Sequence, residues 1–180
     1  MATNVDLPDY RRSLAVLFDR DGTLVRDVPY NADPALVTAM PGARAAVERL
    51  RQAGVPVGVV TNQSGVARGL IAPGALRRVN ERVEELLGPF DVWAVCPHAE
   101  DDGCYCRKPR PGLVLWAAAA LGVRPGDCAV IGDIGRDMAA ARAAGARGIL
   151  VPTPVTLPAE VADAPEVAAT IGEAVERALG

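Results

Sequence analysis

The sequence predicts a three-layer α/β fold, in which a parallel sheet is covered by helices on both faces. Short apolar runs rich in β-branched residues recur five times along the 180 residues. Continuous apolar runs of this length are typical of strands that are buried on both faces. A helical pattern separates each run from the next, and this alternation favours a parallel sheet with right-handed crossovers.

Four of the five expected strands end in a polar or ligand-type residue. The five strands cover residues 14–18, 55–60, 92–95, 129–131 and 148–151. In an open parallel sheet of this Rossmann-like kind, ligands bind at the carboxyl ends of the strands. We therefore look for functional residues directly after the strands.

Four helices are expected between the strands, at residues 41–53, 73–87, 111–121 and 137–144. A glycine follows each of them and a proline begins the first three, which is the usual asymmetry of helix ends. After a proline-rich stretch, apolar spacing predicts a last amphipathic helix over 166–179.

The length of 180 residues suits one domain with one sizeable core. We expect an N-terminal extension of about residues 1–13, a core over 14–151, and a proline-rich segment with the last helix over 152–180. We expect a monomer.

Charge and hydropathy argue against nucleic-acid and membrane partners. The net charge is −3 and the 19 basic residues are spread along the chain, without a basic stripe. No run approaches the roughly 20 apolar residues that span a bilayer, and residues 1–13 lack the apolar segment of a signal peptide. We expect a soluble cytoplasmic protein.

Two carboxylates follow the first expected strand in the segment Asp19-Arg20-Asp21-Gly22-Thr23. A carboxylate can attack a phosphoryl group, and a second one can protonate the leaving oxygen and later activate water. Asp19 and Asp21 therefore suit phosphoryl transfer. Aspartates that merely stabilise a turn remain the alternative.

Further candidates follow the other strands. Thr61 ends the second strand and offers a hydroxyl to a phosphate, while Lys108 offers a fixed positive charge. Asp133 could hold Mg²⁺ together with Asp19, and Asp137 lies four residues later. Taken singly, Thr61 fits a polar turn, Lys108 a solvated side chain, and Asp137 a helix cap.

Together these motifs resemble the haloacid dehalogenase superfamily of phosphohydrolases, from about residue 14 to 151. The resemblance implies Asp19 as nucleophile, Asp21 as general acid and base, and Thr61 and Lys108 as groups that hold the transferring phosphoryl. It implies a Mg²⁺ ion bound by Asp19, Asp133 and the Asp21 carbonyl. Asp137 is similar to a residue that orients the lysine or a metal-bound water. Asp19 and Thr61 are 42 positions apart, which leaves no space for a cap domain between them.

A second metal site is predicted by Cys96, His98, Cys104 and Cys106, which offer four ligands for a tetrahedral structural Zn²⁺. Buried thiols, or a disulfide from Cys96 to either of the other two, are the alternatives. The cluster ends two residues before Lys108, so a zinc loop would fix that lysine. Cys128 lies outside the cluster and needs only a packing role.

Within the superfamily, the cysteine cluster and the segments around residues 61–69 and 106–112 resemble capless D-glycero-D-manno-heptose 1,7-bisphosphate phosphatases. This implies a small phosphorylated sugar as substrate, and contacts from Asp27, Tyr30, Asn62, Gln63, Ser64 and Arg107. Arg68 and Arg136 are further candidates for a distal phosphate.

Two alternatives stay open. The loop from His98 to Cys104 is as short as in histidinol-phosphate phosphatases, which act on another small metabolite. A zinc-stabilised phosphate-binding module without catalysis is the alternative that is not an enzyme.

Overall fold

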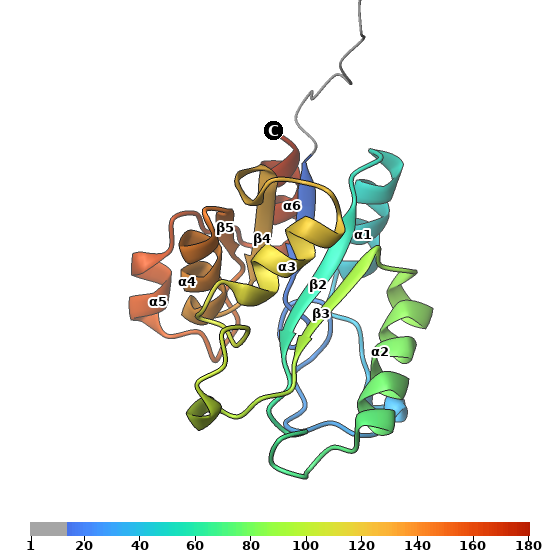
Figure 1. Cartoon of the computed structure of the whole chain (residues 1–180). Coiled ribbons are helices and arrows are strands. Elements are labelled where there is room, and N and C mark those ends of the chain that lie inside the picture. The colour runs from blue at the N-terminus through green and yellow to red at the C-terminus, as the bar shows by residue number, and fades with distance from the viewer. Residues whose placement is uncertain (1–13) are drawn as a thin grey trace, which may run out of the picture.

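The computed structural model describes residues 14–180. The expected N-terminal extension and the missing signal peptide concern residues 1–13, which lie outside this range. Within the described range, five strands form one parallel sheet in the order β3-β2-β1-β4-β5. The strands are β1 Ala15–Phe18, β2 Val57–Asn62, β3 Val92–Cys96, β4 Cys128–Gly132 and β5 Arg147–Leu150 (Figure 1).

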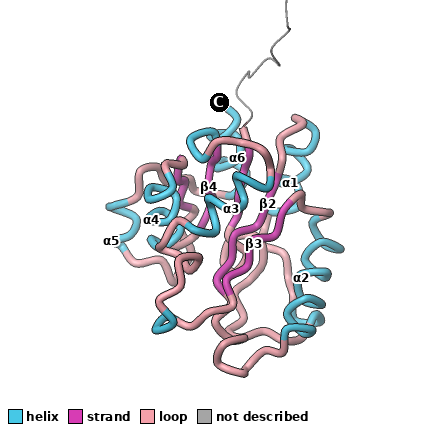
Figure 2. Tube along the Cα trace, in the orientation of Figure 1, coloured by secondary structure: helices cyan, strands magenta, loops and turns pink. Residues whose placement is uncertain are grey.

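Helices cover both faces of the sheet, as Figures 1 and 2 show. The helices α1 Ala43–Gln52, α2 Pro73–Leu87 and α6 Ile171–Leu179 share one buried cluster with the strands, while α3 Gly112–Ala120 and α4 Gly135–Ala144 share the other. Strand β1 contributes side chains to both clusters, because neighbouring side chains of a strand point to opposite faces. Val16 and Phe18 belong to the first cluster, and Ala15 and Leu17 to the second.

The three-layer α/β fold is confirmed, and the strands lie within two residues of their expected bounds. Between β1 and β2 the chain forms a loop, the short 3-10 helix η1 Pro34–Leu36 and α1, which confirms that this insertion carries no cap domain. The remaining 3-10 helices are η2 Glu100–Asp102 and η3 Pro125–Asp127. No helix within residues 14–180 is long and apolar enough to cross a membrane.

The expected helix over 166–179 was wrong at its start. Helix α6 begins at Ile171, and the side chain of Thr170 caps it by accepting from the Glu173 amide at 3.1 Å. The residues before it are extended, because Leu150 at the end of β5 binds the Glu166 carbonyl and the Ala168 amide, both at 2.8 Å. Pairing with the sheet therefore takes the backbone groups that a helix would have used.

The proline-rich segment also contains a helix that the sequence did not predict, α5 Pro158–Asp163. It has no buried residue, so it lacks the apolar spacing by which a helix is recognised. Its first turn is capped by Glu160, which accepts from the Leu157 amide at 2.9 Å.

Truncation of Leu50 should measure the first core cluster. Its side chain is completely buried in α1, so Leu50→Ala should lower the free energy of unfolding by about 2–5 kcal/mol through lost burial and a cavity. Urea denaturation followed by circular dichroism would give this value. Leu36→Ala is the matched control, since Leu36 is 52% exposed; equal losses in both variants would contradict the assigned core.

Candidate active site

The predicted site residues meet at the carboxyl edge of the sheet. Asp19 directly follows β1, Thr61 lies in β2, and Asp133 follows β4, so three neighbouring strands deliver them to one place. Lys108 reaches the same place from the loop between β3 and α3. All four residues are buried, with exposures of 7% or less.

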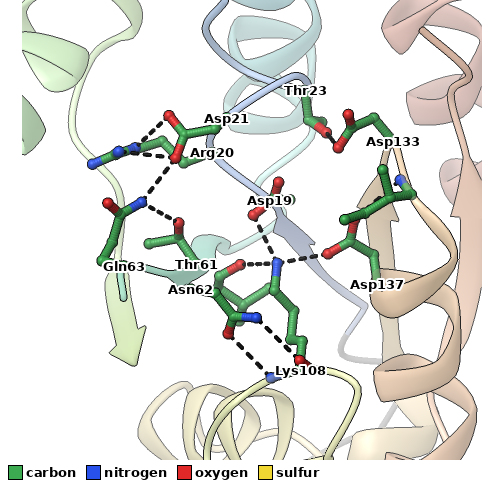
Figure 3. Close-up of polar contacts among 12 residues, drawn as sticks. Asp19, Arg20, Asp21, Thr23, Thr61, Asn62, Gln63, Lys108, Asp133 and Asp137 are labelled. Atoms are coloured by element: carbon green, nitrogen blue, oxygen red, sulfur yellow. Dashed lines mark hydrogen bonds and ion pairs between the residues drawn. The ribbon is translucent and has the colours of Figure 1, made fainter. Parts of the chain in front are cut away.

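Lys108 is the centre of the polar contacts (Figure 3). Its Nζ donates to Asp19 Oδ1 at 2.7 Å, to Asp137 Oδ1 at 2.6 Å and to the Val60 carbonyl at 2.8 Å. Burial lowers the pKa of this lysine, but the two carboxylates raise it more, so its pKa lies above the ordinary value. The lysine is thus a fixed cation beside Asp19.

Asn62 holds the backbone of the lysine from the neighbouring strand end. Its side-chain Nδ2 donates to the Lys108 carbonyl, and its Oδ1 accepts from the Lys108 amide, both at 3.1 Å. This pair of bonds fixes the loop on β2. The amide group of Asn62 therefore supports Lys108.

The carboxylate of Asp21 is turned toward Arg20 and Gln63 (Figure 3). Arg20 donates to both of its oxygens, from Nε at 3.1 Å and from Nη2 at 2.9 Å. Gln63 donates from Nε2 to Asp21 Oδ2 at 2.8 Å and to Thr61 Oγ1 at 2.9 Å. Gln63 is only 5% exposed, so it links Asp21 to Thr61 and offers little surface to a substrate.

A cluster of buried carboxylates fits a divalent cation. Oxygens of Asp19, Asp133 and Asp137 all lie within 4.8 Å of one another. Burial, with a contribution from Asp137, raises the pKa of Asp133 to about 7, and burial also raises the pKa of Asp19. Carboxylates crowded in this way are stabilised by a hard cation, and oxygen ligands are those that Mg²⁺ prefers.

Asp133 and Asp137 make different contacts. Asp137 lies in the first turn of α4, where Oδ2 accepts from the Ile134 amide at 3.3 Å and Oδ1 accepts from Lys108. Both of its oxygens are therefore occupied by protein donors. Asp133 instead faces Gly22, where an added Cβ would lie 2.2 Å from Asp133 Oδ2, so the glycine makes room for this carboxylate.

Hydrogen bonds from the C-terminal segment support the loop that carries Asp133. Thr156 Oγ1 donates to the Asp133 carbonyl at 2.6 Å, and Glu160 of α5 accepts from the Gly135 amide at 3.0 Å. The Val151 amide donates to the Gly132 carbonyl at 2.8 Å. Sequence reasoning missed Thr156 and Glu160, because neither lies in a recognisable motif.

The four predicted zinc ligands come together near the loop between β3 and α3, which carries Lys108. Cys96 Sγ lies 3.5 Å from His98 Nδ1, 3.7 Å from Cys104 Sγ and 3.3 Å from Cys106 Sγ. All four cysteines of the chain are free thiols in the structure. Three thiols and one imidazole nitrogen at this spacing match the donor set of a tetrahedral structural zinc site.

Beside Asp21 lies a cavity of about 240 Å³, which brings together several of the predicted substrate contacts. Asp27, Tyr30 and Ser64 line it, together with Asn62 and Gln63. Burial raises the pKa of Asp27, with Asp21 adding to the effect. At the rim, the Arg68 guanidinium lies 5.9 Å from the centre of the Tyr30 ring and donates to its hydroxyl at 3.1 Å.

The remaining basic candidates differ in their partners. Arg107 lines a smaller cavity of about 180 Å³ with Lys108, and its buried Nε lacks a hydrogen-bond partner within residues 14–180. Its Nη1 donates to the His98 carbonyl at 3.3 Å. Arg136 is paired with Glu100 at 2.9 Å on the surface, so its charge is already matched.

Two stretches of the chain match known hydrolase families. Residues 16–81 match the family described as haloacid dehalogenase-like hydrolase, and residues 105–178 match the family described as HAD-hydrolase-like. The two matches together contain Asp19, Asp21, Thr61, Lys108 and Asp133. The fold and this site therefore define a haloacid dehalogenase-like hydrolase.

Two relatives with the names of phosphatases indicate which hydrolases this chain is most similar to. The D-glycero-β-D-manno-heptose-1,7-bisphosphate 7-phosphatase of Bordetella bronchiseptica is 38% identical over 143 residues, covering 77% of this chain and 80% of the relative. The enzyme of the same name from Pseudomonas aeruginosa is 38% identical over 151 residues, covering 79% and 82%. The chain belongs to this family of phosphatases.

A crystal structure of a relative agrees with this assignment. The D,D-heptose 1,7-bisphosphate phosphatase of B. bronchiseptica, complexed with magnesium and phosphate, superposes with a TM-score of 0.82 at 31% identity. The superposition covers 92% of this chain and 98% of the relative. The related phosphatase from Burkholderia thailandensis gives a TM-score of 0.67 at 25% identity, covering 93% and 99%.

Because the pKa of Asp133 is raised, the stability of the metal-free protein should depend on pH. The folded protein keeps the proton up to about pH 7, whereas the unfolded chain loses it near the ordinary value of 3.8. The free energy of unfolding should therefore fall as the pH rises from about 4 to 7. Asp133→Asn removes this part of the pH dependence.

Thermal unfolding in magnesium-free buffer would measure the effect. The Tm of Asp133→Asn relative to the unchanged protein should be higher at pH 8 than at pH 5. Added Mg²⁺ should raise the Tm of the unchanged protein at pH 8 and leave that of the variant where it was. The same difference in Tm at both pH values would contradict the assigned burial of this carboxyl.

Proposed function

We propose that the chain is a Mg²⁺-dependent phosphomonoesterase that removes the 7-phosphate of D-glycero-D-manno-heptose 1,7-bisphosphate. The proposal rests mainly on one observation, the buried contact of Lys108 with Asp19 at the carboxyl edge of the sheet. A fixed cation orients the carboxylate beside it. Its positive charge also offsets the repulsion between that carboxylate and an anionic phosphoryl group. The activities of the named relatives support the choice of substrate.

The reaction proceeds in two displacements. An oxygen of Asp19 attacks the phosphorus atom, and the bond from phosphorus to the sugar oxygen breaks while Asp21 gives its proton to that oxygen. Water then attacks the phospho-aspartate, Asp21 takes a proton from the water, and inorganic phosphate leaves. Lys108 and the Thr61 hydroxyl hold phosphoryl oxygens throughout.

Mg²⁺ would be held by Asp19, Asp133 and the main-chain carbonyl of Asp21, as in the expectation from the motifs. A bound Mg²⁺ neutralises charge on the phosphoryl oxygens and orients them. Asp137 is assigned to orient Lys108, to which its Oδ1 is bound at 2.6 Å. The relative crystallised with magnesium and phosphate supports this choice of ion.

For the second metal we propose a structural Zn²⁺ bound by Cys96, His98, Cys104 and Cys106. All four ligand atoms lie within 4.8 Å of one another, which supports a closed site without an open position. Arg107 donates to the His98 carbonyl, so the zinc loop and the lysine loop are joined directly. Zinc would therefore hold the catalytic lysine in place without touching the substrate.

The sugar is assigned to the cavity beside Asp21. Asp27, Tyr30 and Ser64 line it and can bind hydroxyl groups. Arg107 lines the separate cavity with Lys108 and is assigned to the second phosphate. Arg68 lies at the rim, bound to Tyr30, and Arg136 is the less suited of the two because Glu100 pairs with it. Asn62 and Gln63 act mainly through Lys108 and Asp21.

We also propose that one domain carries these functions, working as a cytoplasmic monomer. The site draws on strands and loops from Asp19 to Thr156, which supports a single unit. The free thiols of the zinc cluster are typical of a reducing compartment.

One observation favours a second substrate, histidinol phosphate. The loop between His98 and Cys104 is short, as in phosphatases of that kind, and holds only η2 between the ligand pairs. The two substrates can be assayed in parallel. A preference above about tenfold in kcat/KM, about 1.4 kcal/mol, would decide between them.

Asp19→Asn should abolish phosphate release while the protein stays folded. The amide keeps the shape of the carboxylate but cannot act as the nucleophile, so we expect a loss of at least about a thousandfold. Phosphate release from the heptose bisphosphate, with and without Mg²⁺, would measure the loss, and circular dichroism would confirm folding. An unchanged protein that binds phosphate without turnover would instead indicate a binding module.

Cys106→Ser should remove zinc and loosen the lysine loop. We expect less than half of the zinc content of the unchanged protein, together with a lower Tm, because structural zinc contributes folding free energy. Elemental analysis of the purified protein would measure this. Cys128→Ala is the control, since Cys128 lies in β4 outside the cluster; equal zinc in all three proteins would refute the assigned site.

A further inference from the structure

A buried guanidinium lies beside the active site without a part in the reaction described so far. Arg20 stands between the two catalytic aspartates and is only 2% exposed. A buried charge is stabilised only when it is paired and hydrogen-bonded, and the ion pair that the structure gives this arginine is with Asp21. Its contacts therefore indicate what it does.

The contact between Arg20 and Asp21 fixes the plane of the Asp21 carboxylate. Nε and Nη2 of the guanidinium donate side by side to the two carboxylate oxygens, at 3.1 and 2.9 Å. Two parallel hydrogen bonds set the orientation of a carboxylate, which a single bond to a lysine would not do. Gln63 adds a third donor to Asp21 Oδ2.

The guanidinium is itself anchored to a helix. Its remaining Nη1 donates to Asn80 Oδ1 of α2 at 2.7 Å. Asn80 directly follows Val79, which is 1% exposed in the first core cluster, so this part of α2 is firmly packed. Arg20 is thus anchored by a residue sixty positions away in the sequence.

We propose that Arg20, anchored by Asn80, is a positioning residue that orients Asp21 for proton transfer to the leaving oxygen. This inference rests on the proposed function, in which Asp21 is the general acid. In that step the O–H bond of Asp21 breaks, and the proton moves to the sugar oxygen as its bond to phosphorus breaks. The carboxylate that remains accepts hydrogen bonds from Nε and Nη2 of Arg20, which is the contact seen in the structure.

The leaving group distinguishes this role from a general structural one. A sugar alkoxide is a poor leaving group and needs the proton of Asp21, whereas 4-nitrophenolate leaves without one. Loss of Arg20 should therefore slow hydrolysis of the sugar phosphate much more than hydrolysis of 4-nitrophenyl phosphate. A variant that only distorts the site would slow both reactions alike.

The test compares Arg20→Gln and Asn80→Leu with the unchanged, magnesium-loaded protein. For Arg20→Gln we expect kcat/KM for heptose bisphosphate to fall at least about tenfold, chiefly in kcat, and that for 4-nitrophenyl phosphate less than about threefold. Asn80→Leu should give the same pattern at smaller size. Across a series of aryl phosphates, the rates of both variants should depend more steeply on the leaving group.

Arg82→Gln is the matched control, because it removes an arginine of α2 that pairs with the nearby Glu85 at the surface; its rates should equal those of the unchanged protein. Equal losses on both substrates in Arg20→Gln and Asn80→Leu would overturn the inference and leave the proposed function standing. If Arg20→Gln does not fold, the pattern in Asn80→Leu decides. An unchanged protein that hydrolyses neither substrate would overturn the proposed function, and the inference with it.

Discussion

The arrangement of the site depends on the buried ammonium of Lys108. It joins Asp19 after β1, the Val60 carbonyl of β2 and Asp137 of α4, so three separate elements meet at one nitrogen atom. One cation does not balance the three buried carboxylates of Asp19, Asp133 and Asp137. Burial raises the pKa values of Asp19 and Asp133, the neighbouring carboxylates add to the effect, and a divalent cation is the natural counter-charge.

The sequence allowed the fold and the centre of the site to be predicted because both follow from local rules. Apolar runs define the strands, and parallel strands bring the residues at their carboxyl ends to one edge, where Asp19, Thr61 and Asp133 indeed lie. Helix α5 was missed because its residues are not buried, and the start of α6 was wrong because pairing with Leu150 keeps residues 166–168 extended.

Contacts between distant elements could not be predicted in this way. Asn80 lies among polar residues of α2 and has the sequence pattern of a solvated side chain, yet it binds Arg20 of the motif loop. Asn62 and Gln63 follow a strand as substrate contacts would, but their amides bind Lys108 and Asp21. A residue type after a strand therefore indicates membership of the site, whereas only tertiary contacts show which partner it binds.

The loop that carries Asp133 is held partly from the far end of the chain. Thr156 binds the Asp133 carbonyl and Glu160 binds the amide at the start of α4. A shortened protein ending directly after β5 would keep every residue of the family motifs and still lose these two supports. The smallest chain that preserves this geometry is therefore longer than the motifs suggest, and a fusion partner or cleavable tag is better joined beyond α6 than within residues 152–163.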